Sequence, residues 1–251
     1  YKGKKNYLLF RNIYCMYLLF KIILTSNKKD TVVFSLQNSI LSIIVSKIFN
    51  FKIIVRNSAP IDYFKQNTIL YNKIKLFLKM KIYYFSDLII SNSKSSANKI
   101  KKNLNKKIEV VAIPNPIIKL ENKICKTNRK NKILYVGRLS DEKGIFELVE
   151  GFEIFNKDFP KFKLDIVGDG HQRKNLSNFI NSKNLNKQIK IIPWTNVINK
   201  YYKSSKMLVL PSFFEGFGNV LIEALNFNLP CVSNKNDGPK EILANGKYGL
   251  L

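Results

Sequence analysis

Residues 211–225 read Pro-Ser-Phe-Phe-Glu-Gly-Phe-Gly-Asn-Val-Leu-Ile-Glu-Ala-Leu, and this stretch decides the fold class. It follows an apolar run at residues 207–210 that is typical of a buried strand, and residues 219–226 have the apolar spacing of a helix. Gly216 and Gly218 stand where the loop enters this helix, so the first backbone amides of the helix are open to a ligand. A strand, a glycine-containing turn and a helix in this order predict one unit of a parallel α/β sheet.

The same alternation of strand and helix runs through the whole second half of the chain. Strands are expected at residues 133–137, 162–167, 189–192, 207–211 and 231–233. Helices are expected at residues 144–156, 172–182, 196–204, 219–226 and 238–244. Strands that are apolar throughout, separated by amphipathic helices, predict a doubly wound, Rossmann-like parallel sheet with helices on both faces.

The first half repeats this pattern less clearly. Strands are expected at residues 31–35, 52–55, 88–91 and 108–113, and helices at residues 40–49, 72–85 and 95–103. Residues 119–132 are polar and charged and show no apolar periodicity, which is typical of a linker. We therefore expect a partial first domain at residues 1–122, a linker at 123–132 and a second domain at 133–251. Two such domains imply a cleft between them as the default ligand site.

The composition limits the kinds of site that the chain can hold. Of 251 residues, 45% are hydrophobic, which is ordinary for a globular protein. Cys15, Cys125 and Cys231 are odd in number and far apart, so they match neither a disulfide framework nor a zinc site and favour a reducing compartment. The single histidine, His171, excludes a His-rich metal site and speaks against a Ser-His-Asp triad.

Charge is unevenly distributed along the chain. Lys and Arg total 43 against 17 Asp and Glu, a net charge of +26. Residues 1–130 hold 26 basic and five acidic side chains, whereas residues 131–251 hold 17 and 12. Codon bias in an AT-rich genome explains an excess of Lys, but it does not concentrate charge in one half. The asymmetry indicates that the first half faces nucleic acid or a membrane surface; a merely solvated basic face is the alternative.

No segment is expected to cross a membrane or to act as a signal peptide. Residues 7–25 are apolar-rich, but Arg11, Asn12 and Lys21 interrupt them, so they fall short of the roughly 18 unbroken apolar residues of a spanning helix. They also lack a cleavage site of small residues. Because the chain opens at Tyr1 without a Met and stops inside an expected element, we expect a piece of a longer protein, cut at both ends.

The turn after the first expected strand of the second half carries the first candidate site. Gly137 allows a tight turn and a close approach of a ligand to the backbone. Arg138 and Lys143 bracket the turn at the carboxyl edge of the sheet, where open α/β sheets bind ligands. Two cations there suit a phosphate or a diphosphate. The alternative is an ordinary loop in which Asp141 and Glu142 pair with these bases.

Two carboxylates mark the second candidate site. Glu215 and Glu223 are separated by seven residues, and Glu223 lies on an otherwise apolar helix. A carboxylate buried there needs hydrogen-bond donors, and sugar or ribose hydroxyls are suitable ones. The alternative for Glu215 is an acid favoured by the dipole at a helix start. The alternative for Glu223 is a solvated helix face, which its apolar neighbours disfavour.

A third loop, residues 236–243, also enters a helix, with Pro239 near the helix start. A simple turn and cap explains this loop at least as well as a contact with a ligand.

These motifs resemble those of the nucleotide-binding domain of family four glycosyltransferases. Members of that family are retaining enzymes of the GT-B fold that act in bacterial surface-polysaccharide, lipopolysaccharide and glycan assembly. The resemblance covers residues 131–251, and its four stretches run in the family's order: VGRLSDEKG at 136–144, IVGDG at 166–170, VLPSFFEGFGNVLIEAL at 209–225 and GPKEIL at 238–243. A thinner resemblance in the first half rests on residues 53–58, 86–93 and 110–116. The fold that it implies is GT-B, two Rossmann-like doubly wound parallel-sheet domains facing a cleft.

The resemblance also implies a role for each candidate residue. Arg138 and Lys143 would grip the diphosphate of a nucleotide sugar, Glu223 would hold the ribose hydroxyls, and Glu215 would contact the donor sugar without acting as a nucleophile. The implied catalytic residues are Arg138, Lys143 and Glu215. The other donor-binding residues that it implies are Gly137, Gly216, Phe217, Gly218, Asn219, Val220, Trp194 and Thr195. The amides of residues 218–220 would cap a phosphate, and residues 193–195 would lie near the base through backbone atoms.

The implied function is retaining transfer of a hexose from a nucleotide-diphosphate donor. A UDP-hexose or UDP-N-acetylhexosamine is favoured, GDP-mannose stays open, and the acceptor would be a glycan or a polyprenyl-linked glycan. No metal and no cofactor are expected, because cationic side chains and helix dipoles would replace the metal. The basic first half fits an anionic membrane surface rather than nucleic acid, so the implied location is cytoplasmic, peripheral at the inner face of the plasma membrane.

Two features depart from the family's pattern. The glycine-rich loop that normally opens the first domain is not visible, and the histidine that many members carry in that domain has no counterpart, since the one histidine is His171. Whether this piece is itself active is therefore open. The alternatives are a sugar-nucleotide epimerase of the same fold, a non-catalytic basic module that binds nucleic acid or membranes, and an inactive fragment. The paired glutamates favour the transferase over the epimerase, and no zinc-finger or RNP-type motif supports nucleic-acid binding.

Overall fold

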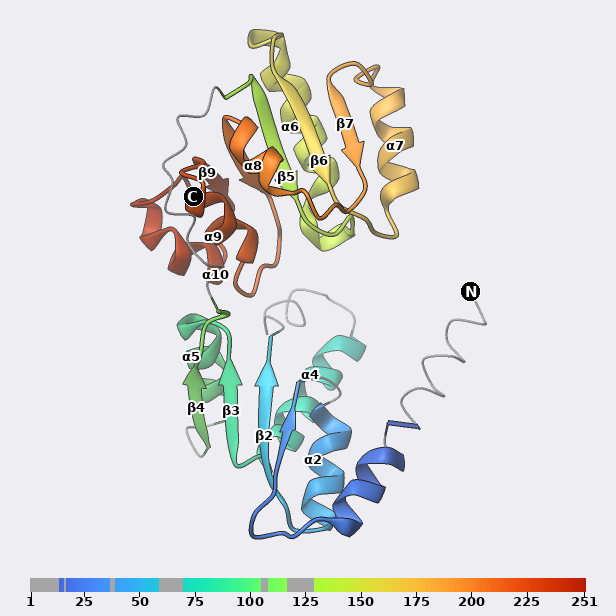
Figure 1. The fold of residues 1–251 in the computed structure, drawn as a ribbon, viewed down its shortest axis with the longest axis vertical. Coiled ribbons are helices and arrows are strands. Elements are labelled where there is room, and N and C mark those ends of the chain that lie inside the picture. Colours follow the sequence, from blue (N-terminus) through green and yellow to red (C-terminus); the bar gives the residue numbers. More distant parts are fainter. Residues whose placement is uncertain (1–13, 16, 37–38, 59–69, 105–107, 117–128) are drawn as a thin grey trace. The chain divides into compact units, whose positions relative to one another are not determined.

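The chain folds into two compact units, each built on one parallel sheet. The computed structural model describes residues 14–15, 17–36, 39–58, 70–104, 108–116 and 129–251. The units comprise Tyr1–Pro114 and Asn115–Leu251, and their elements are labelled in Figure 1. The predicted α/β class with parallel strands is confirmed. Most of the predicted linker lies outside the described residues.

The first unit carries a four-stranded sheet in the order β1-β2-β3-β4. Its strands are β1 (Val32–Ser35), β2 (Lys52–Asn57), β3 (Leu88–Ser91) and β4 (Glu109–Ala112). The helices that connect these strands are α2 (Ser39–Ile48), α4 (Leu70–Tyr83) and α5 (Lys94–Asn103). All of these elements begin and end within two residues of the predicted bounds.

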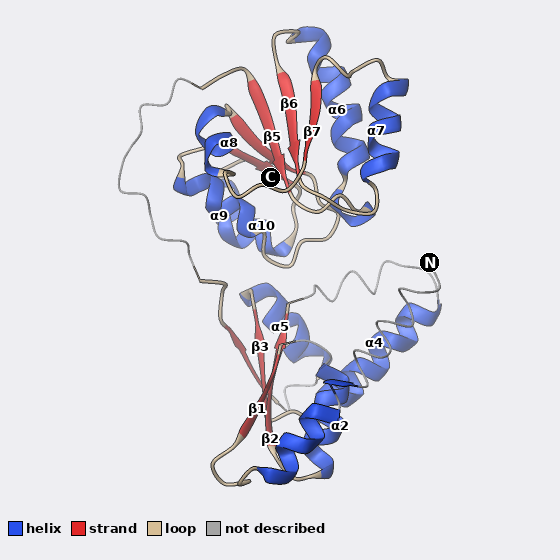
Figure 2. Cartoon of the chain, turned by 45° about the vertical axis from the view of Figure 1, so that its right-hand side comes forward, coloured by secondary structure: helices blue, strands red, loops and turns tan. Residues whose placement is uncertain are grey.

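The three helices that connect the strands of the first unit lie on one face of its sheet. Each strand pairs in parallel with the strand before it, and right-handed crossovers then place every connecting helix on the same side, as Figure 2 shows. Under the helices, Ile53, Val55 and Ile89 are fully buried. On the other face, Val32 and Phe34 of β1 remain half exposed.

The second unit carries a five-stranded sheet in the order β7-β6-β5-β8-β9. Its strands are β5 (Lys132–Val136), β6 (Lys163–Val167), β7 (Ile189–Ile192), β8 (Met207–Leu210) and β9 (Cys231–Ser233). Its α-helices are α6 (Ile145–Asp158), α7 (Arg173–Ser182), α8 (Asn199–Ser204), α9 (Asn219–Asn226) and α10 (Asp237–Ile242). Two 3₁₀ turns, η1 (Asp141–Lys143) and η2 (Ala244–Gly246), complete it.

This sheet is doubly wound, as the sequence predicts. The central strand β5 is buried from Ile133 onward, which explains its unbroken run of apolar residues. In Figure 2, α6 and α7 cover one face of the sheet while α8 and α9 cover the other. The chain builds outward from β5 through β6 to β7, then returns to β8 on the other side of β5. The strand order therefore reverses between β5 and β8, and open α/β sheets bind their ligands at the carboxyl ends of strands at such a point.

Arg129, which the sequence places in the linker, is bound into the second unit. Its guanidinium donates hydrogen bonds to four backbone carbonyls, those of Tyr202, Ser205, Phe227 and Asn228, at 2.7–3.4 Å. These carbonyls lie in the last turn of α8 or just beyond the ends of α8 and α9, where helix geometry leaves them without partners. One side chain thus ties the ends of two helices to the segment that leads into β5.

Candidate active site

Two loops that the sequence predicts as parts of one site leave the sheet at its reversal point. Residues 137–144 follow β5 and residues 211–218 follow β8, and these two strands are direct neighbours. The loops are fastened to one another, because the Phe213 amide donates a 3.0 Å hydrogen bond to the Glu142 carbonyl. A Cβ atom on Gly144 would also overlap the Pro211 carbonyl oxygen. The structure therefore brings the two principal candidate sites together.

The strongest contact between these loops joins two predicted catalytic residues. Lys143 Nζ lies 2.7 Å from Glu215 Oε2, and the two side chains are 14% and 15% exposed. This pairing differs from the simple alternative in which Lys143 is neutralised by an acid of its own loop. Glu142 instead accepts a 2.8 Å hydrogen bond from Ser140 Oγ. Asp141 accepts a hydrogen bond from Gln172, and its Oδ2 lies 3.2 Å from His171 Nε2.

Arg138 is the accessible cation of the site. Its side chain is 75% exposed, and its guanidinium lies 3.6 Å from Glu142, which is at the long end for an ion pair. Because it is so open to solvent, this pair contributes little to stability. An exposed guanidinium at the carboxyl end of β5 is available to an anionic ligand.

The Tyr135 side chain occupies the space beside Gly137. The sequence suggests that this glycine lets a ligand approach the backbone, but a Cβ atom here would lie 2.8 Å from the Tyr135 hydroxyl. That hydroxyl donates a 2.9 Å hydrogen bond to the Arg138 carbonyl and so fixes the turn. Burial raises the pKa of Tyr135, and the negative charges of Glu215 and Glu142 raise it further. Tyr135 therefore stays protonated, and its hydroxyl remains the hydrogen-bond donor to the Arg138 carbonyl.

Helix α9 begins at the reversal point with open backbone donors. Its N-cap, Gly218, adopts a left-handed conformation with φ of 97°, which glycine tolerates best. No side chain caps this end, and the first turn holds no acidic residue. Gly216 and Phe217, which lead into it, are buried, while Asn219 is exposed. The first amides of α9, at Asn219 and Val220, are oriented as a helix N-terminus orients donors toward an anion.

Glu223 has a partner that the sequence does not reveal. The Tyr202 hydroxyl donates a 2.6 Å hydrogen bond to Glu223 Oε2. Tyr202 is 1% exposed and lies on α8, so the donor comes from the neighbouring helix of the same face. The sequence predicts that this carboxylate needs donors, and the structure supplies one from the protein, 21 residues away along the chain.

Trp194 and Thr195 follow β7, two strands away from β5 in the sheet order. The Trp194 ring is exposed, and its backbone amide donates a 3.3 Å hydrogen bond to Asp169 Oδ2. Asp169 also binds Arg173 at 2.8 Å, and this hydrogen bond lowers the pKa of Asp169. The Thr195 hydroxyl accepts from the Val197 amide. These two residues share the carboxyl edge of the sheet with the other candidates but are not in the same loop pair.

The third candidate loop has a packing role in the structure. Gly238 at the start of α10 is buried, and a Cβ atom on it would overlap the backbone of Phe217. Asn234 and Asn236 donate side-chain hydrogen bonds to the carbonyl of Ser212. This loop therefore packs against the loop after β8, and the Asn236 side chain makes no capping hydrogen bond to α10.

The described residues also bear on metal binding and on membrane crossing. Within those residues, no group of three or more His, Cys, Asp and Glu side chains is arranged to hold a metal ion. No described helix combines the length and the apolar character needed to cross a bilayer.

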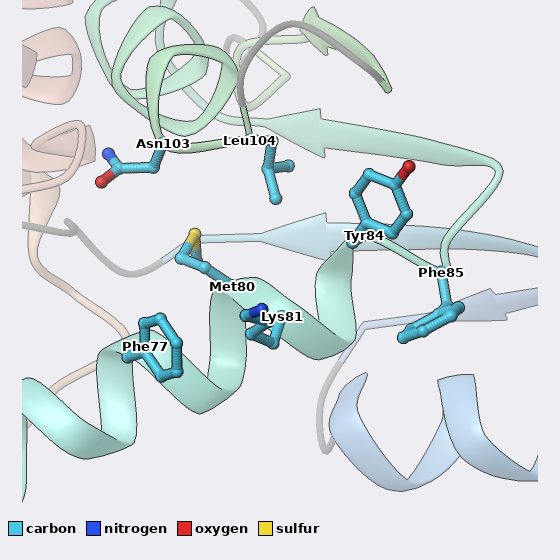
Figure 3. Close-up of a pocket in the computed structure, with 7 residues that line it drawn as sticks. All are labelled: Phe77, Met80, Lys81, Tyr84, Phe85, Asn103 and Leu104. Atoms are coloured by element: carbon cyan, nitrogen blue, oxygen red, sulfur yellow. The ribbon is translucent and has the colours of Figure 1, made fainter.

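The first unit holds a cavity of about 520 Å³ that the sequence does not predict. Figure 3 shows it between α4 and the end of α5. The side chains that line it are Phe77, Met80, Lys81, Tyr84, Phe85, Asn103 and Leu104. It is therefore mainly aromatic and aliphatic, with one cation, and contains none of the predicted site residues.

A match to a protein-family model identifies the family of this chain. The model described as "Glycosyl transferases group 1" matches residues 117–251, more than half of the chain. The chain belongs to the group 1 glycosyl transferases. The family predicted from the four sequence stretches is thereby confirmed, and so is the GT-B type of its fold.

Two similar proteins named as glycosyltransferases agree with this assignment. An uncharacterized glycosyltransferase of Methanocaldococcus jannaschii is 32% identical over 241 residues, covering 83% of this chain and 59% of that protein. The N-acetylgalactosamine-N,N'-diacetylbacillosaminyl-diphospho-undecaprenol 4-alpha-N-acetylgalactosaminyltransferase of Campylobacter jejuni is 31% identical over 185 residues, covering 71% of this chain and 50% of that protein. The chain thus spans about half the length of these relatives.

The fold is also that of a solved glycosyltransferase structure. S. aureus TarM, crystallised with UDP among other ligands, superposes with a TM-score of 0.74 at 21% identity, covering 94% of this chain and 48% of TarM. At this identity the likeness concerns the fold alone.

Proposed function

We propose that the protein transfers a hexose from a nucleotide-diphosphate donor to a glycan or polyprenyl-linked acceptor, with retention at the anomeric carbon. The observation that carries this proposal is the meeting of Lys143, Glu215 and the N-terminus of α9 at the reversal point of the second sheet, in a chain of the glycosyl transferase family. Cations and open amides suit a diphosphate, while a carboxylate suits sugar hydroxyls. The reversal point is where ligands bind in such sheets.

Each residue has a distinct part in the proposed reaction. The acceptor oxygen replaces the diphosphate at the anomeric carbon, and the acceptor's proton passes to the departing phosphate oxygen. Arg138 and Lys143 offset the negative charge that develops on the leaving diphosphate, together with the amides of Asn219 and Val220. Glu215 accepts hydrogen bonds from hydroxyls of the donor sugar.

The remaining donor contacts would hold the nucleoside. Glu223 accepts from the ribose hydroxyls, and backbone atoms at Trp194 and Thr195 lie along the base. Fixed cations and a helix dipole stabilise a leaving diphosphate without a divalent ion, so we propose metal-independent transfer.

A uridine nucleotide is the favoured donor, as a hexose or N-acetylhexosamine derivative. The TarM structure contains UDP, which supports uridine as the base to test first. The Campylobacter relative is named for an acceptor on diphospho-undecaprenol, which supports a polyprenyl-linked acceptor in surface-polysaccharide synthesis.

The first unit suits a peripheral position at the inner face of the plasma membrane. Helix α4 and the residues after it expose several large apolar side chains beside lysines: Ile74, Phe77, Leu78, Tyr84 and Phe85 are 45–59% exposed. Exposed apolar side chains together with lysines favour anionic lipid surfaces, at about 1 kcal/mol for each well-placed cation.

Vesicle sedimentation tests this membrane proposal. We expect the chain to sediment with phosphatidylglycerol vesicles at low salt and not with phosphatidylcholine vesicles. Leu78→Ser on α4 should weaken this binding, whereas Ile154→Ser, at a more exposed apolar position on α6, should not. Equal effects of the two substitutions would argue against α4 as the membrane contact.

Calorimetric titration tests the donor site. The 251-residue chain is titrated with UDP and with GDP, each with and without EDTA. We expect saturable binding of one nucleotide that survives EDTA and is weakened by about tenfold or more in Arg138→Ala. A folded chain that binds neither nucleotide would overturn the proposed function for this piece.

A further inference from the structure

Neighbouring residues hold the Tyr202 side chain in the position from which it contacts Glu223. The Tyr202 ring stacks on Phe227 at 5.6 Å between centroids and 12° between planes. Its hydroxyl donates to Glu223 Oε2 at 2.6 Å, a short, charge-assisted hydrogen bond. Arg129 donates to the carbonyls of Tyr202 and Phe227, so both rings of the stack have their backbones held by the same guanidinium.

The hydrogen bond from Tyr202 occupies only one of the two carboxylate oxygens of Glu223. Among the residues that the structure describes, Glu223 Oε1 has no hydrogen-bond partner. Glu223 is partly buried, with the buried residues Leu221 and Ala224 nearby on α9. Because one carboxylate oxygen is held by a hydrogen bond, the position of the other oxygen is also defined. Less conformational entropy of the Glu223 side chain is then lost when a ligand donates a hydrogen bond to it.

We propose that Tyr202 is a positioning residue for ribose recognition: it holds the Glu223 carboxylate in the orientation that accepts the ribose hydroxyls of the donor nucleotide. This inference rests on the proposed function and adds to it a residue of α8, outside the donor loops. Burial raises the pKa of Tyr202, and the adjacent Glu223 raises it further, so the hydroxyl remains a donor throughout the neutral range.

The chain offers a closely matched control. Tyr202→Phe keeps the buried ring and its stack on Phe227 and removes only the hydroxyl. Tyr201→Phe makes the same chemical change one position earlier on α8. The Tyr201 hydroxyl has no hydrogen bond among the described residues, and its ring lies beneath Lys200. A general effect of removing a tyrosine hydroxyl from this helix would therefore appear in both variants.

The test compares a ribonucleotide with its 2′-deoxy analogue. Calorimetry gives the affinity of the whole chain for UDP and for 2′-deoxy-UDP, or for the guanosine pair where GDP is the nucleotide that binds. We expect the unchanged protein to prefer the ribonucleotide. In Tyr202→Phe, we expect affinity for the ribonucleotide to fall about tenfold while affinity for the deoxy analogue changes little, because the lost hydrogen bond served the 2′-hydroxyl contact. Tyr201→Phe should retain the original preference.

The outcomes separate this inference from the function on which it rests. If the unchanged protein binds neither nucleotide, the proposed function fails. If it binds a nucleotide but Tyr202→Phe keeps the original preference, or no preference exists at the outset, the donor site stands and the role of Tyr202 is overturned.

A second comparison covers the case in which Tyr202→Phe does not fold. Glu223→Gln and Tyr202→Phe/Glu223→Gln carry no unpaired buried charge at this contact. We expect the single variant to retain more ribose preference than the double variant, and equal preferences would overturn the inference.

Discussion

Lys143 Nζ and Glu215 Oε2 form a 2.7 Å ion pair that joins the loop after β5 to the loop after β8. The sequence predicts separate tasks for these residues, a cation for the diphosphate and an acid for the donor sugar. Because the two charges touch, a change in either residue alters what the other presents to a ligand. Binding and stability are therefore coupled at this pair, and the first prediction concerns both.

Replacing Lys143 should lower activity and stability together. Lys143→Ala leaves the Glu215 carboxylate, 15% exposed, without its cation. We expect the free energy of unfolding to fall by about 1–3 kcal/mol, as measured by urea denaturation. In the full-length protein, turnover should fall roughly a hundredfold or more. Lys143→Ala/Glu215→Ala should recover part of the stability but none of the turnover; strictly additive losses of stability would contradict the coupling.

Replacing Arg138 should weaken nucleotide binding without lowering stability. Its side chain is 75% exposed and makes one long ion pair, so little folding energy depends on it. We expect Arg138→Ala to weaken nucleotide binding by about tenfold or more, with an unchanged melting temperature. Lys174→Ala, which removes an exposed cation from α7, is the control and should bind normally. Equal weakening in both variants would indicate a general charge effect instead of a specific contact.

Arg129 should matter for folding although it lies outside the site. Arg129→Ala removes donors from four carbonyls at the ends of α8 and α9. We expect a loss of about 2–3 kcal/mol in the free energy of unfolding, and Arg129→Lys should restore little, because an ammonium cannot span both helix ends. Lys130→Ala, at an exposed neighbour, should be neutral. A neutral Arg129→Ala would mean that water satisfies these carbonyls.

Two glycines of adjoining elements should respond to alanine in opposite directions. Gly144 has φ of 63°, and a Cβ atom there would overlap the Pro211 carbonyl oxygen, so Gly144→Ala should cost at least about 1–3 kcal/mol. Gly151 lies within α6 with nothing within 4 Å of a Cβ atom. Gly151→Ala should raise the free energy of unfolding by about 0.5–1 kcal/mol. Denaturant titration measures both, and the same sign for both would contradict the loop packing.

The contact between Asp141 and His171 should appear in a pH titration. The hydrogen bond from His171 lowers the pKa of Asp141 below its ordinary value of 3.8. A lowered folded-state pKa means that the ionised carboxylate favours folding above about pH 4, and that this contribution disappears as the pH falls through the folded-state value. Carbon NMR of the carboxyl group should show the pKa of Asp141 rising in His171→Ala. An unmoved pKa would assign the shift to Gln172 instead.

The elements were predictable because each depends on nearby residues. The predicted bounds of β3, β7, α9 and β9 coincide with those observed, since short apolar runs and clear turn residues define these elements locally. Helix α8 begins at Asn199, three residues later than predicted. The Thr195 hydroxyl accepts from the Val197 amide, and this turn holds the intervening residues out of the helix.

The candidate site was predictable as a set of loops but not as a set of contacts. The motifs identify Arg138, Lys143, Glu215 and Glu223, and the strand order explains why their loops meet. The partners of Glu223 and Arg129 were missed because they lie 21 to 99 residues away along the chain. The need of a buried carboxylate for a donor was visible in the sequence, but a pattern of residues does not say which distant tyrosine supplies it.

The glycine contacts at the carboxyl edge of the second sheet limit how this site can evolve. Backbone atoms are in direct contact at three places: Gly144 with Pro211, Gly168 with Gly137, and Gly238 with Phe217. No side chain separates the loops at these contacts, so a side chain larger than that of glycine could not be accommodated there without pushing the loops apart. Substitutions that change ligand contacts without disturbing this packing are therefore expected at outward-facing positions of the same edge, such as Asn219 and Trp194.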